Sequence, residues 1–203
     1  MPTLRDIDAV VTDPPYGIGF KYDDHDDNEA EWYGLMNDVV PALRRLAPFV
    51  VMPNCRMQAM RWWFAHHAPD WLIAWYKGSP GHRAAIGFNA WEPHLVWGRP
   101  PVDMLDFFQT PLVLDENDHP CVKPVAYAQW LVIRGSLPGQ TVLDPFMGSG
   151  TTGVACLRSG RRFVGVEITE RYCAIAAERV AVESAQARLF PDEEGPHRTG
   201  SLF

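Results

Sequence analysis

The sequence predicts an α/β fold in which helices cover both faces of a mostly parallel β-sheet. Short apolar runs alternate with helical stretches along the chain, which is the pattern of such a sheet. Two of the runs, Ile7–Thr12 and Thr141–Leu143, are followed directly by a loop that contains Pro or Gly. Open α/β sheets bind their ligands in loops of this kind, at the carboxyl ends of buried strands. The 203 residues are enough for one substantial domain, to which we assign residues 1–187.

Strands are expected where β-branched and aromatic residues form short runs between turn residues. These runs are Ile7–Thr12, Pro48–Met52, Trp71–Tyr76, Glu92–Trp97, Thr141–Leu143 and Arg162–Glu167. Helices are expected where apolar residues recur on one face, as Trp32, Met36 and Leu43 do. The expected helices are Glu29–Leu46, Cys55–His67, Pro124–Gly135, Thr151–Ser159 and Glu170–Ala187.

Three segments lack a regular pattern. Lys77–Gly87 is rich in Gly, Pro, Ser, His and Arg and is expected to form a loop. Arg99–Asp118 has weak periodicity and contains three prolines, which predicts a connector. Residues 188–203 lack the pattern of a core-forming segment and are expected to form a disordered tail.

The composition of the sequence indicates the cellular compartment of the protein. The sequence has no run of about 18 apolar residues and no signal-peptide core, so neither a membrane span nor secretion is expected. The four cysteines are widely separated and show no spacing typical of a metal site. They are Cys55, Cys121, Cys156 and Cys173. We expect buried, free thiols and a cytoplasmic protein.

The charge of the chain is unevenly distributed. A net charge of −7 disfavours strong nonspecific binding to nucleic acid. Residues 1–40, however, hold ten acidic residues against two basic ones, whereas residues 41–112 hold seven basic residues against four acidic ones. The second segment indicates either a basic face for nucleic acid or ordinary solvated charge, and the sequence leaves both interpretations open.

Two motifs carry the functional signal. Asp13-Pro14-Pro15-Tyr16 follows the first predicted strand, and Asp144-Pro145-Phe146-Met147-Gly148-Ser149-Gly150-Thr151-Thr152 follows a later one. In this order they resemble the DPPY and FxGxG motifs of the permuted, β-type branch of the DNA amino-methyltransferases. The resemblance covers about residues 5–187. It implies a Rossmann-like domain that uses S-adenosylmethionine, has a circularly permuted motif order and acts on a flipped adenine in DNA.

The second motif has the features of a cofactor loop. Gly148 and Gly150 let the backbone approach a ligand closely, and the helix that follows offers free amides to a carboxylate. Glu167, at the end of the next predicted strand, is suited to accept the hydrogens of a ribose diol. An NAD site has the same geometry, but the absence of GxGxxG spacing and the presence of DPPY favour S-adenosylmethionine.

The resemblance extends the set of expected cofactor residues. His119-Pro120-Cys121-Val122-Lys123-Pro124 resembles the HPxxKP segment of the family, which packs beside the methionine end of the cofactor. The full set is Asp144, Pro145, Phe146, Gly148, Ser149, Gly150, Thr151, Thr152, Glu167, Ile168, His119 and Lys123.

The first motif suits chemistry on an exocyclic amine, which is a poor nucleophile because its lone pair is delocalised into the ring. Asp13 and the carbonyl of Pro14 can accept the amine hydrogens, and Pro14 and Pro15 stiffen the loop. Tyr16 offers a flat face on which an extruded base can stack. In the family, Asp as the first residue is typical of adenine-N6 enzymes, and Ser of many cytosine-N4 enzymes. This chemistry needs no metal, so none is predicted for the acidic segment around Asp23 and His25.

DNA contacts are expected from two loops and the connector. The candidates are Phe20, Lys21, Lys77, His82, Arg83 and Arg99. Family members commonly insert a recognition region where this chain has only residues 99–118, which predicts short or relaxed sequence specificity. Family members also usually have a strand that ends in Gly-Asp before DPPY, and this sequence lacks it. The shortened region makes a homodimer attractive for holding DNA.

Several alternative functions remain open at this stage. They are methylation of cytosine N4 in DNA, of an RNA base or of a protein amide, and a noncatalytic binding subunit that keeps the fold.

Overall fold

The computed structural model describes residues 6–19, 28–53, 59–78, 83–84, 87–88, 90–110 and 123–189. For residues 83–84, 87–88 and 187–189 it describes the backbone alone. Four of the predicted contact residues therefore lie outside the described residues. They are Phe20, Lys21, His82 and His119. The same is true of the acidic segment around Asp23 and of residues 190–203 of the predicted tail.

A seven-stranded sheet forms the centre of the molecule. Its strands, in spatial order, are β7 (Phe107–Gln109), β3 (Trp71–Tyr76), β6 (Trp91–Gly98), β2 (Phe49–Pro53), β1 (Ala9–Val11), β8 (Thr141–Asp144) and β9 (Arg162–Gly165). β6 runs antiparallel to β2 and β3, and the other neighbouring strands are parallel. The predicted α/β class with a mostly parallel sheet is therefore confirmed.

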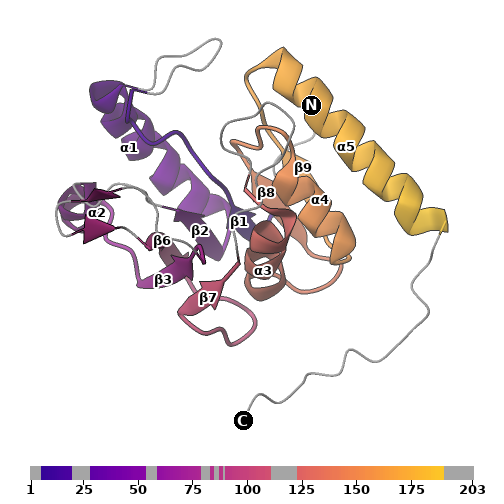
Figure 1. Ribbon diagram of the computed structural model, residues 1–203, viewed down its shortest axis with the longest axis horizontal. Helices are drawn as coiled ribbons and strands as arrows, with labels where there is room; N and C mark the ends of the chain where they lie inside the picture. Colours follow the sequence, from indigo (N-terminus) through magenta and orange to yellow (C-terminus); the bar gives the residue numbers. More distant parts are fainter. Residues whose placement is uncertain are drawn as a thin grey trace.

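Helices cover both faces of this sheet (Figure 1). α1 (Glu29–Leu46) and α2 (Met60–His66) pack on one face, and α3 (Val125–Gly135) and α4 (Thr151–Arg158) pack on the other. The long helix α5 (Glu170–Leu189) lies along α4. No helix in the part of the chain that the structure describes is long and apolar enough to cross a membrane.

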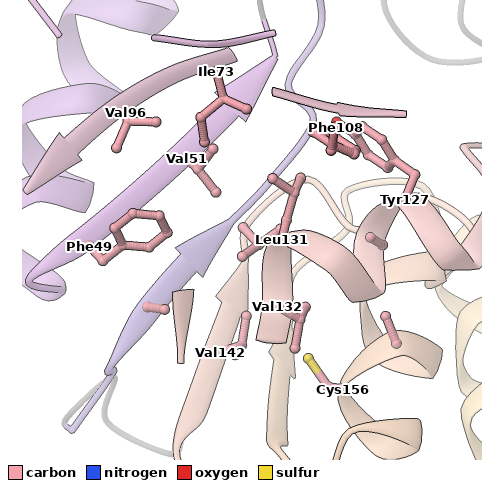
Figure 2. Close-up of a cluster of buried hydrophobic side chains, with 14 of the residues drawn as sticks. Phe49, Val51, Ile73, Val96, Phe108, Tyr127, Leu131, Val132, Val142 and Cys156 are labelled. Atoms are coloured by element: carbon pink, nitrogen blue, oxygen red, sulfur yellow. The ribbon is translucent and has the colours of Figure 1, made fainter. Parts of the chain in front are cut away.

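Alternating residues of the strands feed two separate cores. Val10 and Val50 point to the core beneath α1, while Val51 points to the core beneath α3. Figure 2 shows this second core, in which side chains from β2, β3, β6 and β8 meet those of α3 and α4. Because the strands are buried on both faces, their sequences are almost continuously apolar, as expected for strands of a parallel sheet.

The predicted elements needed several corrections. The connector Arg99–Asp118 contains β7, an edge strand that pairs in parallel with β3. A strand of three residues is too short to give a periodic signal in the sequence. A tertiary contact holds β7 in place: Phe108 stacks on Trp130, with 4.1 Å between the ring centroids. The antiparallel pair of β4 (Arg83–Ala84) and β5 (Gly87–Phe88) lies in the predicted loop Lys77–Gly87, and β5 extends one residue beyond it. Cys156 is buried as expected, but Cys173 is exposed because it lies on the outer side of α5.

The strand order places the two motifs side by side. β1 and β8 are adjacent and parallel, so the loops that follow them start at the same edge of the sheet. The chain then leaves β1 towards α1 on one face and leaves β8 towards α4 on the other. This divergence of two neighbouring connections marks the position at which open α/β sheets bind their ligands.

Candidate active site

A buried carboxylate joins the two motif loops. Asp144, at the end of β8, accepts hydrogen bonds from the hydroxyl of Thr12 at 2.6 Å and from the hydroxyl of Thr152 at 2.7 Å. The backbone amide of Phe146 donates a third, at 3.1 Å. Asp144 therefore fastens the end of β1 to the end of β8 and to the first turn of α4. Asp144 and Thr152 were predicted to bind the cofactor, whereas Thr12 was not predicted, because its only signal in the sequence is its position directly before Asp13.

Burial raises the pKa of Asp144 to about 6, although the hydrogen bonds from Thr12 and Thr152 oppose the rise. A raised pKa in the folded state contributes stability below the ordinary value of 3.8, and that contribution is lost as the pH rises through about 6. Ionisation of Asp144 at neutral pH therefore lowers the free energy of unfolding relative to the protonated form.

Asp144→Asn is therefore expected to gain stability relative to the wild type as the pH rises from 4 to 7.5. A difference of about two pKa units corresponds to a relative gain of about 3 kcal/mol at most. Urea unfolding of both proteins across this range measures it. His94, whose pKa burial lowers to about 4, has the opposite pH dependence but is common to both proteins. A stability difference that does not change with pH would contradict the raised pKa.

The loop after β8 is held from one side by Glu167. The amide of Gly148 donates to one carboxylate oxygen of Glu167 at 2.9 Å, and the amide of Thr169 donates to the other at 2.9 Å. β9 ends at Gly165, two residues earlier than predicted, so Glu167 stands in the loop and reaches across to Gly148. Gly148 has φ 49°, and a Cβ there would meet no atom within 4 Å, so its face is open to a ligand.

Arg179 holds the same loop from the other side. Its guanidinium, on α5, donates to the carbonyl of Ser149 at 2.7 Å, to the hydroxyl of Ser149 at 2.9 Å and to the hydroxyl of Thr151 at 3.4 Å. No sequence pattern pointed to Arg179, because a single Arg on a helix is usually solvated. The hydroxyls of Ser149 and Thr151 thus help to fix the loop.

Gly150 has a packing role that sequence analysis did not foresee. Its φ is 81°, and an added Cβ would lie 2.9 Å from Cβ of Ala176 and 3.0 Å from its Cα. The glycine therefore allows α5 to pack closely on the start of α4.

Gly150→Ala is expected to destabilise the protein more than Gly139→Ala does, by at least about 2 kcal/mol. Gly139 is a matched control because its φ is 80° and nothing lies within 4 Å of an added Cβ. Both variants carry the strain of a positive φ, and only Gly150→Ala adds the clash with α5. Chemical denaturation gives the two free energies of unfolding, and equal losses would show that α5 moves away without cost.

The loop after β1 is organised around Asp13. The hydroxyl of Tyr16 donates a short hydrogen bond to Oδ1 of Asp13, and Nζ of Lys123 lies 3.2 Å from Oδ2. Lys123 also donates to the hydroxyl of Tyr16, at 3.0 Å. The indole of Trp32, on α1, donates to the carbonyl of Pro15 at 2.7 Å. Lys123 was predicted beside the cofactor, and the structure brings its ammonium to this loop.

The expected DNA contacts separate into two groups. Lys77 follows β3 at the same sheet edge as Asp13 and pairs with Glu92 at 3.2 Å. Arg99 follows β6, which runs the other way, so it lies at the opposite edge, next to the start of β2. The structure therefore does not bring Arg99 to the motif loops. Of Arg83 only the backbone, in β4, is described.

Among the residues that the structure describes, no group of three His, Cys, Asp or Glu side chains is placed to hold a metal ion.

Comparison with known proteins relates this chain to DNA methylases. Residues 84–178 match the family model described as "DNA methylase". The protein named "Putative methylase YubD", from Escherichia coli (strain K12), is 31% identical over 193 residues, which are 86% of this chain and 82% of YubD. DNA adenine methyltransferase YhdJ, from the same organism, is 40% identical over 103 residues. Type II methyltransferase M.SmaI of Serratia marcescens is 52% identical over 64 residues.

The last two matches are partial. The match with YhdJ covers 50% of this chain and 35% of YhdJ. The match with M.SmaI covers 32% of this chain and 22% of M.SmaI. This chain therefore spans about a third or less of these two relatives.

Solved structures share the fold over most of the chain. The complex of M1.HpyAVI with S-adenosylmethionine superposes with a TM-score of 0.65 at 23% identity, covering 87% of this chain and 89% of that one. TTHA0409 from Thermus thermophilus, complexed with S-adenosyl-L-methionine, has a TM-score of 0.57 at 25% identity, with 88% and 87% covered. The cytosine-N4-specific PvuII DNA methyltransferase has a TM-score of 0.63 at 16% identity, with 86% and 79% covered.

Proposed function

Since the chain belongs to the N6/N4 DNA methylase family, we propose that it transfers a methyl group from S-adenosylmethionine to the N6 amine of adenine in DNA. The observation that carries this proposal is the hydrogen bond from Thr12 to Asp144. It fastens the loop of Asp13, with its acceptors for an amine, to the loop of Gly148, with its open backbone. S-adenosylmethionine and the amine of the target base would thus bind at two loops that this hydrogen bond holds together.

The residues around Gly148 fit the cofactor. The carboxylate of Glu167 is aimed at the loop by two backbone amides and keeps lone pairs for a ribose diol. Ile168 follows it with its side chain 90% exposed, which offers an apolar surface for an adenine ring. When bound, S-adenosylmethionine supplies a methyl group activated by the positive charge on its sulfur.

Asp13 prepares the amine for attack. Its carboxylate and the carbonyl of Pro14 accept the amine hydrogens, which lets the nitrogen turn its lone pair towards the methyl carbon. With S-adenosylmethionine held by Glu167 and the Gly148 loop, the nitrogen would gain the methyl group, the electron pair of the broken bond would stay with sulfur, and the positive charge would pass to the nitrogen. The nitrogen loses a proton in turn, and Asp13 is the carboxylate placed to receive it. Lys123 and Tyr16 keep Asp13 aimed throughout.

Two observations support adenine over cytosine. The DPPY motif begins with Asp13, as in the adenine enzymes that the sequence resembles, and YhdJ carries the name of a DNA adenine methyltransferase. The deciding experiment incubates the protein with labelled S-adenosylmethionine and unmethylated DNA, followed by digestion and separation of the nucleosides. N6-methyladenine is the expected product. N4-methylcytosine would overturn the base assignment, and no transfer to DNA with intact cofactor binding would overturn the function.

Short or relaxed sequence specificity belongs to the same proposal. Residues 99–118 stand where the family inserts its recognition region, and part of this segment is used for the edge strand β7. Of the expected DNA contacts, Lys77 lies at the sheet edge of Asp13, where it is 16% exposed and pairs with Glu92. Two copies on one DNA would compensate for the short segment, so we propose a cytoplasmic enzyme that dimerises on DNA. Sedimentation with and without a DNA duplex measures this.

A further inference from the structure

Four side chains of alternating charge form a network at the base of the Asp13 loop. Lys77 Nζ lies 3.2 Å from Glu92 Oε2, Lys123 Nζ lies 3.7 Å from Glu92 Oε1, and the same Nζ lies 3.2 Å from Asp13 Oδ2. The charges are positive, negative, positive and negative in order, so this network of four side chains has no net charge. It runs from the end of β3 through β6 to the loop after β1.

Three of the four charges in this network are largely sheltered from water, and Asp13 is 32% exposed. The side chain of Glu92 is 4% exposed, and those of Lys77 and Lys123 are each 16% exposed. The ammonium of Lys123 also lies 5.8 Å from the ring centroid of Trp75 and 5.9 Å from that of Tyr127. In such surroundings a charge is screened less than at the surface, so it acts on its neighbours over a longer distance.

Three oxygen acceptors near the ammonium of Lys123 come from the motif loop and from β6. They are the hydroxyl of Tyr16, the carboxylate of Asp13 and the carboxylate of Glu92, the last being the longest contact. The first two oxygens lie within 3.2 Å of Nζ, whereas Oε1 of Glu92, at 3.7 Å, interacts with the ammonium as an ion pair without a hydrogen bond. Glu92 is the member of the set that belongs to a strand of the sheet, β6, and its charge attracts Lys123 from that side.

We propose that Glu92 is a positioning residue for the methyl transfer, an inference that rests on the function proposed above. Glu92 shares the ammonium of Lys123, so that Asp13 keeps free acceptor capacity for the amine of the target base. The negative charge of Glu92 also keeps this network of four side chains neutral next to the nitrogen that becomes positive during the reaction. Without that charge, the two lysines would leave a net positive charge close to the forming cation and would oppose it.

Glu92→Gln tests this inference, because it removes the charge and preserves the shape. The rate of methyl transfer at saturating DNA is expected to fall about 10- to 100-fold, while the dissociation constant for S-adenosylmethionine stays within about twofold. Glu183→Gln is the matched control, since Glu183 is a 15% exposed carboxylate that pairs at 2.8 Å with Arg158, outside this network. Glu92→Asp keeps the charge and is expected to retain most of the rate, which also serves if Glu92→Gln folds poorly.

The double variant Lys77→Met with Glu92→Gln separates charge from structure. It restores neutrality by removing one charge of each sign, so it is expected to recover part of the rate lost in Glu92→Gln. A purely structural role for Glu92 predicts a further loss instead. A Glu92→Gln rate within twofold of the wild type, or a double variant no faster than Glu92→Gln, would overturn the inference.

One readout does not depend on activity. Nitrogen-15 NMR of the lysine ammonium groups is expected to show a slowly exchanging signal for Lys123 in the wild type, which Glu92→Gln loses. If the wild type methylates no DNA, the proposed function fails, and the NMR signal still decides whether Glu92 holds Lys123. An unchanged signal in the variant would contradict that hold.

Discussion

Asp13→Asn is expected to lower the rate of methyl transfer by about 10³-fold and to leave the binding of S-adenosylmethionine unchanged. The substitution keeps the shape of the side chain but removes the charge that faces the amine and pairs with Lys123 at 3.2 Å. The amide nitrogen would also present hydrogens where the amine needs an acceptor. Single-turnover transfer at saturating DNA measures the rate, and calorimetric titration measures the cofactor.

Asp38→Asn provides the matched control for this variant. Asp38 is exposed on α1, so the same chemical change there is expected to leave the rate unaltered. A variant of Asp13 that transfers methyl groups at the wild-type rate would remove Asp13 from the mechanism. A variant that has lost cofactor binding as well would show that Asp13 serves the structure of both loops.

Glu167→Ala is expected to weaken the binding of S-adenosylmethionine by about 100-fold or more. Two hydrogen bonds from a ribose diol to a carboxylate are together worth at least about 3 kcal/mol, which corresponds to about that factor. The variant also frees the amide of Gly148, which Glu167 holds at 2.9 Å, so the loop loses its fixed form.

Two further variants separate these contributions. Glu167→Gln keeps an oxygen for the amide of Gly148 and is expected to bind the cofactor better than Glu167→Ala does, but less tightly than the wild type. Glu178→Ala, at an exposed position on α5, is expected to bind like the wild type. Wild-type affinity in Glu167→Ala would show that the cofactor binds elsewhere.

Local patterns in the sequence were sufficient for most helices and strands and for the position of the motifs, but not for the short strands β4, β5 and β7. The helix Glu29–Leu46 was predicted with its observed bounds, because its apolar face and flanking residues are all local signals. The two loops were expected at the carboxyl ends of strands, and the pairing of β1 with β8 puts them there together.

The contacts that organise the site could not be predicted in this way. Lys123 and Tyr16 are separated by 107 positions, and Arg179 and Ser149 by 30. Such contacts depend on the order of strands in the sheet, which periodicity does not reveal. Glu92 was missed for another reason: it lies within an apolar strand, where its charge was not read as part of a site.

The central position of β1 has a consequence for synthesis on the ribosome. β1 pairs with β8, and Thr12 with Asp144, across 132 positions of the sequence. During synthesis, β1 can pair with β2 before β8 has emerged from the ribosome. Until then, the side of β1 that later pairs with β8 is an unpaired edge. Unpaired, apolar edges are sites of misassembly, and contacts between distant positions form slowly. The interval between the emergence of β2 and that of β8 is therefore the period in which the nascent chain most needs protection.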